Sequence, residues 1–376
     1  MDMLPFREIW CLDFEFEAQA GERQHPLCMV AIEMRTGRAV RLWRDDLYRR
    51  RGRPPFNTGA DVLFVAFFAS AEIGCFLPLD WPAPEAMLDL YPEFRRLTNG
   101  PTLPAGNGLV GACQYHGIPM MSGDEKGGNR ALILRGGPWT GEEQARIVDY
   151  RAADVEATRR LFLAMLPAIL GHGDHKATLG RALLRGRYMG AVAAMEFRGI
   201  PVDLEALTGL RHHWSAIQAS LIAEVDAAYG VYEGNSFRTA RFAAWLDREG
   251  IYWPRLESGA LDLSRDTFRQ QARAFPQVAP LHELRHALSE LRLNDLAVGA
   301  DGRNRCLLSP FSSRTGRNQP SNSKFVFGPA TWIRHLITPP PGRAIIAADY
   351  SAQEIAIAAA LSGDPKLIAG YRDGDP

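Results

Sequence analysis

The chain has 376 residues, of which 46% are hydrophobic, with 43 Lys or Arg against 43 Asp or Glu. This length allows two or three domains with buried cores. The balanced charge excludes a strongly basic protein, so any surface for nucleic acid must come from local arginine clusters, for which residues 49–53, 181–187 and 314–317 are candidates.

The five cysteines show no C-x-x-C spacing and most lie in apolar runs. They are typical of reduced core thiols rather than zinc ligands or disulfides. The sequence also shows no secretory signal pattern and no run of about 18 apolar residues. We therefore expect a cytoplasmic, monomeric protein with no membrane partner.

Residues 9–16, IWCLDFEF, alternate apolar and acidic side chains. Asp13 and Glu15 are two apart, so on a strand they point to the same face. Two neighbouring carboxylates repel each other unless a cation such as Mg²⁺ neutralises them. The alternative is a solvated strand face.

A second acidic pattern follows a predicted helix start at residues 140–143, TGEE. Tyr150 and Asp154 are four residues apart, so they share one face of that helix. The alternative is an ordinary amphipathic helix.

Taken in order, D-x-E and then Y-x-x-x-D resemble motifs I and III of the DEDDy 3′-5′ exonucleases. The best match to motif II is Glu72, which follows an apolar strand at residues 62–65. Here glutamate stands where the family has aspartate, and Ser70 or Ala69 stands in place of its asparagine.

The resemblance implies an RNase H-like α/β fold and phosphodiester hydrolysis with two Mg²⁺ or Mn²⁺ ions roughly 4 Å apart. It also implies that Tyr150 orients the attacking water. The implied metal ligands are Asp13, Glu15, Glu72 and Asp154.

A third pattern lies near the C-terminus. Residues 344–348, AIIAA, predict a buried strand that leads into a lone Asp349, and residues 354–361 predict a helix behind it. Aspartate suits a hard divalent cation. The alternative is an aspartate that caps the following helix.

Asp349-Tyr350-Ser351-x-x-Glu354, followed by LSGDP, resembles motif A of the family A DNA polymerases. The resemblance implies that Asp349 binds both catalytic metals, and that Tyr350 and Glu354 lie at the incoming dNTP. Glu354 would be the steric gate against a ribose 2′-hydroxyl. Upstream, Thr315-Gly316-Arg317 resembles the family's T-G-R element, which contacts primer-template DNA.

The resemblance spans the chain and implies an α/β exonuclease domain, a mainly helical thumb and the start of an α+β polymerase palm. The expected hairpin of the first domain lies at residues 35–38, and the first thumb helix at 204–229. The implied divisions are 1–170 for the exonuclease-like domain, 171–186 for a linker, 187–300 for the start of the polymerase part and the thumb, and 301–376 for the incomplete palm.

The sequence after motif A contains no fingers helix and no motif C. We therefore expect part of a family A DNA-directed DNA polymerase acting in replication or repair, either as a fragment or as a truncated gene product, and unable by itself to extend a primer. Expected partners are primer-template DNA, a single-stranded 3′ end and, in a completed enzyme, dNTPs. Two alternatives remain open, namely a stand-alone 3′-5′ exonuclease with a vestigial polymerase part and a non-catalytic DNA-binding remnant.

Overall fold

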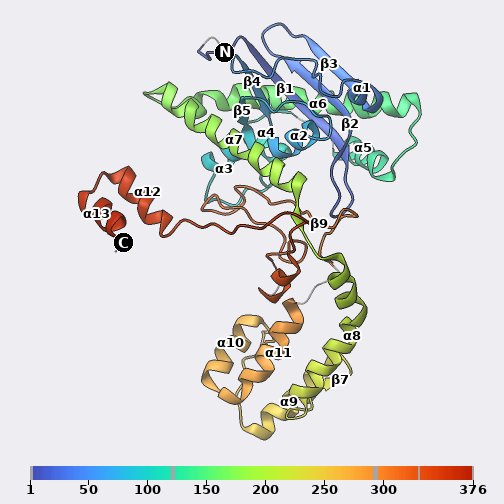
Figure 1. The fold of residues 1–376 in the computed structure, drawn as a ribbon, viewed down its shortest axis with the longest axis vertical. Coiled ribbons are helices and arrows are strands. Elements are labelled where there is room, and N and C mark those ends of the chain that lie inside the picture. Colours follow the sequence, from blue (N-terminus) through green and yellow to red (C-terminus); the bar gives the residue numbers. More distant parts are fainter. Residues whose placement is uncertain (1–2, 120–122, 291–294, 329–330, 375–376) are drawn as a thin grey trace. The chain divides into compact units, whose positions relative to one another are not determined.

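The computed structural model describes residues 3–119, 123–290, 295–328 and 331–374 (Figure 1). The chain divides into two compact units, Met1–Ile337 and Thr338–Pro376, which are described separately. Within the described residues, none of the helices combines the length and the apolar character needed to cross a membrane.

In the described part of the first unit, a five-stranded mixed sheet has the order β3-β2-β1-β4-β5. β1 is central, pairs antiparallel with β2 and parallel with β4. The predicted hairpin is confirmed, because the Glu33 N–H donates to the Arg38 carbonyl at 2.8 Å between β2 and β3. The strands are β1 (Glu8–Glu17), β2 (His25–Glu33), β3 (Ala39–Trp43), β4 (Val62–Ala66) and β5 (Ala86–Asp89).

Helices cover both faces of this sheet (Figure 1). Alternation along β1 sorts its side chains, so that Cys11 lies in the core cluster containing Leu161 of α6 and Leu12 in the cluster containing Met189 of α7. The helices are α1 (Arg44–Arg49), α2 (Ala69–Phe76), α3 (Leu90–Leu97), α4 (Leu109–Tyr115), α5 (Gly123–Arg135), α6 (Gly141–Leu170) and α7 (His175–Arg198).

The predicted helix start before Tyr150 is confirmed. Thr140 and Glu143 form a capping box at the beginning of α6, in which the Thr140 hydroxyl accepts from the Glu143 N–H and the Glu143 carboxylate accepts from the Thr140 N–H. We call the five-stranded sheet with helices α1 to α7 the sheet domain. The predicted linker at 171–186 is wrong beyond residue 174, because α7 begins at His175 and buries Leu179 in the core of this domain.

A helical region follows, and its first helix, α8, agrees with the prediction for residues 204–229. This region has its own core, in which Phe242, Trp253 and Phe268 make mutual aromatic contacts. The elements are β6 (Ile200–Pro201), α8 (Leu204–Asp226), β7 (Tyr232–Glu233), β8 (Ser236–Phe237), α9 (Thr239–Glu249), α10 (Arg265–Ala274), η1 (Pro276–Val278) and α11 (Ala279–Glu290).

After the helical region the chain returns to β6, at the start of that region. β9 (Arg303–Asn304) pairs antiparallel with β6, and η3 (Thr331–Leu336) closes a small core with Val202 and Trp214. Residues 305–328, the described part of the connection from β9 to η3, form no helix or strand.

The second unit contains α12 (Gln353–Ser362) and α13 (Pro365–Asp373). The helix predicted at residues 354–361 is confirmed, but the strand predicted at 344–348 is wrong. Ile346 in that segment is 87% exposed. A strand needs a hydrogen-bonded neighbour, and no strand in the described part of the chain pairs with these residues.

Candidate functional site

The candidate site lies where β1 meets α6, two elements that pack against each other. Asp13 and Glu15 occupy alternate positions of β1 and therefore share one face of the strand, the face that α6 covers. Tyr150 and Asp154 lie one helical turn apart on α6. The structure thus brings together side chains from opposite ends of the sheet domain's sequence.

Arg151 lies between these carboxylates, and the sequence interpretation missed it. Its Nη1 is 2.8 Å from Oδ2 of Asp13, its Nε is 3.3 Å from Oε2 of Glu15, and its Nη2 is 2.9 Å from Oδ2 of Asp154. The Arg151 side chain is only 13% exposed. One guanidinium therefore joins three acidic side chains. We call Asp13, Glu15, Asp154 and Arg151 the acid–arginine cluster.

Tyr150 flanks this cluster rather than joining the ion pairs. The Cζ atom of Arg151 lies 4.4 Å from the centroid of the Tyr150 ring, within cation–π distance. Burial, followed by the charge of Asp154, raises the pKa of the Tyr150 hydroxyl. The ring therefore supports the guanidinium in its place.

Glu72 enters the site from α2. Its Oε2 atom accepts a hydrogen bond from the Phe14 N–H at 2.7 Å, and its carboxyl group interacts with the neighbouring carboxyl group of Asp13. Burial, and then the Asp13 charge, raise the pKa of Glu72 well above its ordinary value. Two buried carboxyl groups this close disfavour a second negative charge, which is the electrostatic reason that the pKa of Glu72 is raised.

The start of α2, which carries Glu72, is fixed by another buried aspartate. Asp89, at the end of β5, accepts hydrogen bonds from the Phe68 N–H at 2.8 Å and the Ala69 N–H at 2.7 Å. It also caps α3 by accepting from the Tyr91 N–H at 2.9 Å. The position of an aspartate directly before a helix indicates the cap, but not the contact with α2.

Burial and the charge of Arg151 dominate the electrostatics of the Asp13 and Glu15 carboxyl groups. Burial raises the pKa values of Asp13 and Glu15, and the Arg151 guanidinium opposes this change. Burial also disfavours charge on Arg151, yet the surrounding Asp13, Glu15 and Asp154 carboxylates raise its pKa above its ordinary value. Arg151 is thus the charge that makes the buried carboxylates tolerable.

The donor set alone suits a hard divalent cation, because it consists of carboxylate oxygens. The arrangement does not, because the Arg151 guanidinium occupies the place between them. Among the residues that the structure describes, no group of three or more His, Cys, Asp or Glu side chains is arranged to hold a metal ion. As folded, the cluster holds an arginine where the sequence predicts metals.

The T-G-R residues lie on a segment that packs against the sheet domain. Arg95 of α3 donates to the Ser312 carbonyl at 2.9 Å, and Asn99 donates to the Arg314 carbonyl at 2.9 Å. Thr315 and Arg317 themselves are exposed. Two hydrogen bonds thus hold the backbone beside the T-G-R residues, while their side chains reach the surface.

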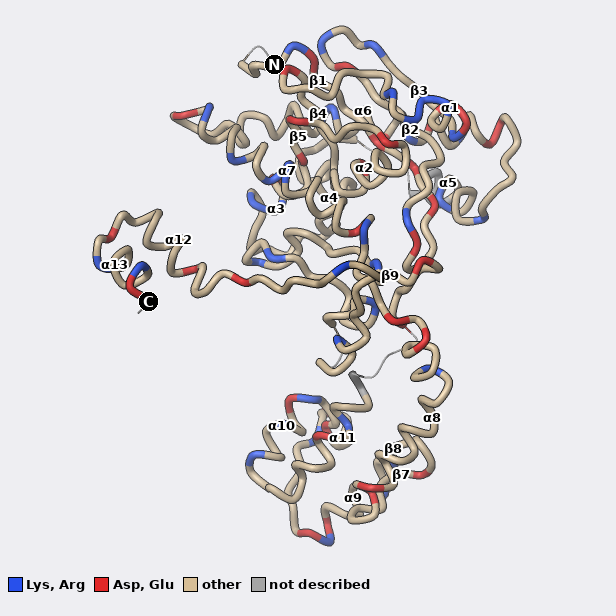
Figure 2. The backbone as a smooth tube through the Cα atoms, viewed as in Figure 1, with Lys and Arg blue, Asp and Glu red and all other residues tan. Residues whose placement is uncertain are grey.

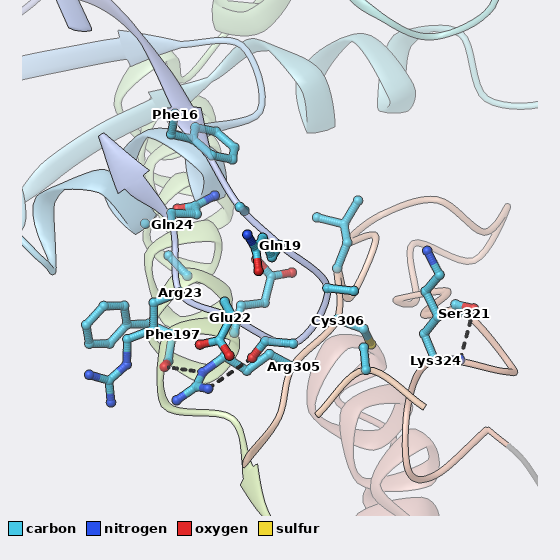
Figure 3. A pocket seen from close by; sticks show the side chains of 18 of the residues that line it. Phe16, Gln19, Glu22, Arg23, Gln24, Phe197, Arg305, Cys306, Ser321 and Lys324 are labelled. Carbon is cyan, nitrogen blue, oxygen red and sulfur yellow. Dashed lines mark hydrogen bonds between the residues drawn. The ribbon is translucent and has the colours of Figure 1, made fainter. Parts of the chain in front are cut away.

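A cavity of about 700 Å³ lies between the β1–β2 loop, the end of α7 and the segment after β9 (Figure 3). In its wall, Glu196 accepts from the Leu308 N–H at 2.7 Å, and burial raises the pKa of Glu196 to about 7. The buried Arg305 donates to the carbonyls of Phe197 and Gly21 at 2.9 and 3.1 Å. These contacts join three separate segments of the chain.

The motif A residues belong to the second unit. Asp349 is exposed in the segment before α12, Tyr350 is 80% exposed, and Glu354 lies in the first turn of α12. The Tyr371 hydroxyl of α13 donates to the Ser351 carbonyl at 3.1 Å, which ties the motif to the second helix of its own unit.

Comparisons with known proteins agree on one family of relatives, although no family model matches the chain. It is 26% identical over 196 residues to DNA polymerase I of Chloroflexus aurantiacus, covering 48% of this chain and 21% of that protein. It is 26% identical over 185 residues to the DNA polymerase of Mycobacterium phage L5, covering 47% and 31%. The chain therefore spans less than a third of the length of these relatives.

The fold also resembles a solved structure, the POL domain of Pol1 from M. smegmatis in complex with DNA primer-template and dNTP. The TM-score is 0.63 at 17% sequence identity, and the match covers 97% of this chain and 61% of that one. At this identity the likeness describes the fold.

Proposed function

We propose that this chain is related to the family A DNA polymerases and acts in DNA synthesis by binding primer-template DNA. The observation that carries the proposal is the exposed T-G-R segment, whose neighbouring carbonyls accept hydrogen bonds from the side chains of Arg95 in α3 and Asn99 just after it. Arginines that contact phosphates supply most of the affinity for DNA. In Figure 2 basic and acidic residues are interspersed over the whole tube, so such contacts would come from local groups of arginine.

The proposal extends to the motif A residues of the second unit. Asp349 would hold a divalent cation together with the triphosphate of a dNTP, while Tyr350 and Glu354 would lie beside the nucleotide. Support comes from the T-G-R and motif A patterns on one chain whose relatives are polymerases. In this proposal Glu354 excludes the 2′-hydroxyl of a ribonucleotide.

A 3′-5′ exonuclease-type site is the finer part of the proposal. Asp13, Glu15, Glu72 and Asp154 are the residues that would hold Mg²⁺ or Mn²⁺, provided that Arg151 withdraws. Divalent ions bound there would supply charge stabilisation for phosphodiester hydrolysis. Tyr150, beside the cluster, would orient the attacking water.

One observation favours a second candidate function, DNA binding without nuclease chemistry. The Arg151 guanidinium already pairs with three of the carboxylates that hydrolysis would require. A domain of this kind would hold a DNA 3′ end and leave it intact.

DNA binding is tested by fluorescence anisotropy with a labelled primer-template. Replacing Arg317 by Ala should weaken binding about tenfold at low salt and reduce the salt slope by about one. The matched control is Arg7→Ala. Arg7 is an exposed arginine directly before β1, and it pairs with Asp61. Equal affinity of Arg317→Ala and the parent chain would contradict the role of the T-G-R segment.

The nuclease part is tested with a 3′-labelled single-stranded oligonucleotide and Mg²⁺ or Mn²⁺. Release of nucleotides that disappears in Asp13→Ala would support the exonuclease. An intact oligonucleotide with both metals, together with tight primer-template binding, would favour the non-catalytic candidate.

A further inference from the structure

We infer that Arg151 is the built-in cation of the acid–arginine cluster and competes with divalent metal ions for its carboxylates. This inference deepens the exonuclease-type site of the proposed function and rests on it. It assigns to Arg151 control over whether that site takes up metal.

The Arg151 guanidinium lies within ion-pair distance of three carboxylates. Three nitrogens of one guanidinium each face a different carboxylate, at 2.8, 3.3 and 2.9 Å for Asp13, Glu15 and Asp154. Mg²⁺ would need carboxylate oxygens at about 2.0–2.1 Å from its own centre. The ion and the guanidinium therefore cannot share the space between the same oxygens.

The local sequence explains why Arg151 is in this position. Arg151 and Asp154 are three residues apart on α6, so one face of the helix carries both the cation and one of its anions. The packing of α6 on β1 then delivers that face to Asp13 and Glu15. The Tyr150 ring at 4.4 Å covers the guanidinium from the side.

Arg151 cannot leave the cluster by losing its proton, because a guanidinium stays charged in proteins at any ordinary pH. A metal ion must instead displace the whole side chain, which is 13% exposed, and separate three ion pairs at once. The wild-type chain should therefore bind metal weakly, and its melting temperature should not depend on metal.

Removal of the Arg151 guanidinium should allow the carboxylates to bind metal. In Arg151→Ala, Asp13, Glu15 and Asp154 are left as buried carboxylates that repel each other, and an added divalent cation would take over the neutralising charge of the guanidinium. The variant should thus be less stable than wild type in EDTA and should regain stability with metal. The variant should also bind a divalent metal ion more tightly than wild type does.

The experiment measures Mn²⁺ binding by calorimetry, and melting temperature in EDTA and in Mn²⁺, on the full chain. We expect Arg151→Ala to bind Mn²⁺ at least about tenfold more tightly than wild type, a change of the size seen when the surroundings of metal ligands are altered. Mn²⁺ should raise the melting temperature of the variant only. The matched control is Arg159→Ala on the same helix, which breaks a pair with Glu156 at 2.7 Å and should behave as wild type.

A second variant keeps the test decisive if Arg151→Ala does not fold. Arg151→Lys retains one charge without the planar fork, so its Mn²⁺ affinity should exceed that of wild type and be reduced by adding Asp13→Ala. Wild-type chain that binds Mn²⁺ as tightly as either Arg151 variant would overturn the inference.

The nuclease assay separates this inference from the proposed function. If Arg151→Ala binds Mn²⁺ but leaves DNA intact, the inference stands and the proposed exonuclease fails. If wild type binds Mn²⁺ tightly and degrades DNA, the exonuclease stands and the inference fails.

Discussion

Arg151 donates a hydrogen bond from Nη1 to Oδ2 of Asp13 at 2.8 Å, across 138 positions of sequence. The pair joins the helix α6 to the central strand β1 inside the sheet domain. Both side chains are largely buried, at 13% and 19% exposure, so neither charge is well solvated without the other. The fold of the domain and the charge balance of its acidic site therefore depend on the same contact.

The raised pKa of Glu72 leads us to expect unequal effects of two substitutions. Glu72→Gln keeps an acceptor for the Phe14 N–H and a donor for Asp13, so we expect a loss of less than about 1 kcal/mol in the free energy of unfolding. Glu72→Ala leaves the Phe14 N–H without its partner and should cost about 2–3 kcal/mol. Urea unfolding measures both. Equal losses in the two variants would contradict the raised pKa of Glu72.

Glu196 predicts a pH dependence of stability. Burial raises its pKa from 4.5 to about 7 in the folded chain, so the folded state holds a proton that the unfolded state releases between these values. The contribution of Glu196 to the free energy of unfolding is therefore fully present below pH 4.5. It is lost as the pH rises through about 7, by up to about 3 kcal/mol.

Glu196→Gln should remove this contribution while keeping an acceptor for the Leu308 N–H. Urea unfolding of both proteins from pH 4.5 to 8 measures the difference, in which the other titrating groups cancel. A difference that stays constant over the whole range would refute the shifted pKa of Glu196.

We expect a large loss of stability when Arg305, in the wall of the cavity, is replaced. It is 5% exposed, pairs with Asp301 and donates to the carbonyls of Gly21 and Phe197. Arg305→Ala removes the donor of several carbonyls at once and should cost about 3 kcal/mol of the free energy of unfolding. The control is Arg238→Ala, an exposed pair with Glu233 that should cost less than about 1 kcal/mol. Similar losses in both would contradict the joining role of Arg305.

The close approach of α7 to β5 requires a glycine at position 186. A Cβ atom at this position would lie 1.9 Å from the Met87 carbonyl oxygen, so Gly186→Ala forces the helix away from the strand. We expect a loss of about 2–3 kcal/mol, as for overpacked cores. Gly180→Ala on the same helix meets nothing within 4 Å and should gain up to about 1 kcal/mol through helix propensity. Thermal unfolding of the two variants distinguishes these outcomes, and a stable Gly186→Ala would refute the close approach.

The local patterns of the sequence determined the elements that carry the acidic site. A period of two placed Asp13 and Glu15 on one strand face, and a spacing of four placed Tyr150 and Asp154 on one helix face. The capping residues before α6 likewise follow from neighbours in the chain. Such features depend on backbone geometry over a few residues, and for that reason the sequence alone predicts them.

The tertiary structure decided what fills the site and which expected elements form. No local pattern in the sequence distinguishes Arg151 from other helix residues. Its ion pairs with Asp13 and Glu15 form only because α6 packs on β1. The contact of Asp89 with the start of α2 has the same origin. Residues 344–348 have the composition of a strand but pair with none in the described part of the chain. Ion pairs and sheet hydrogen bonds both need partners distant in sequence, and only the packing of the whole chain supplies them.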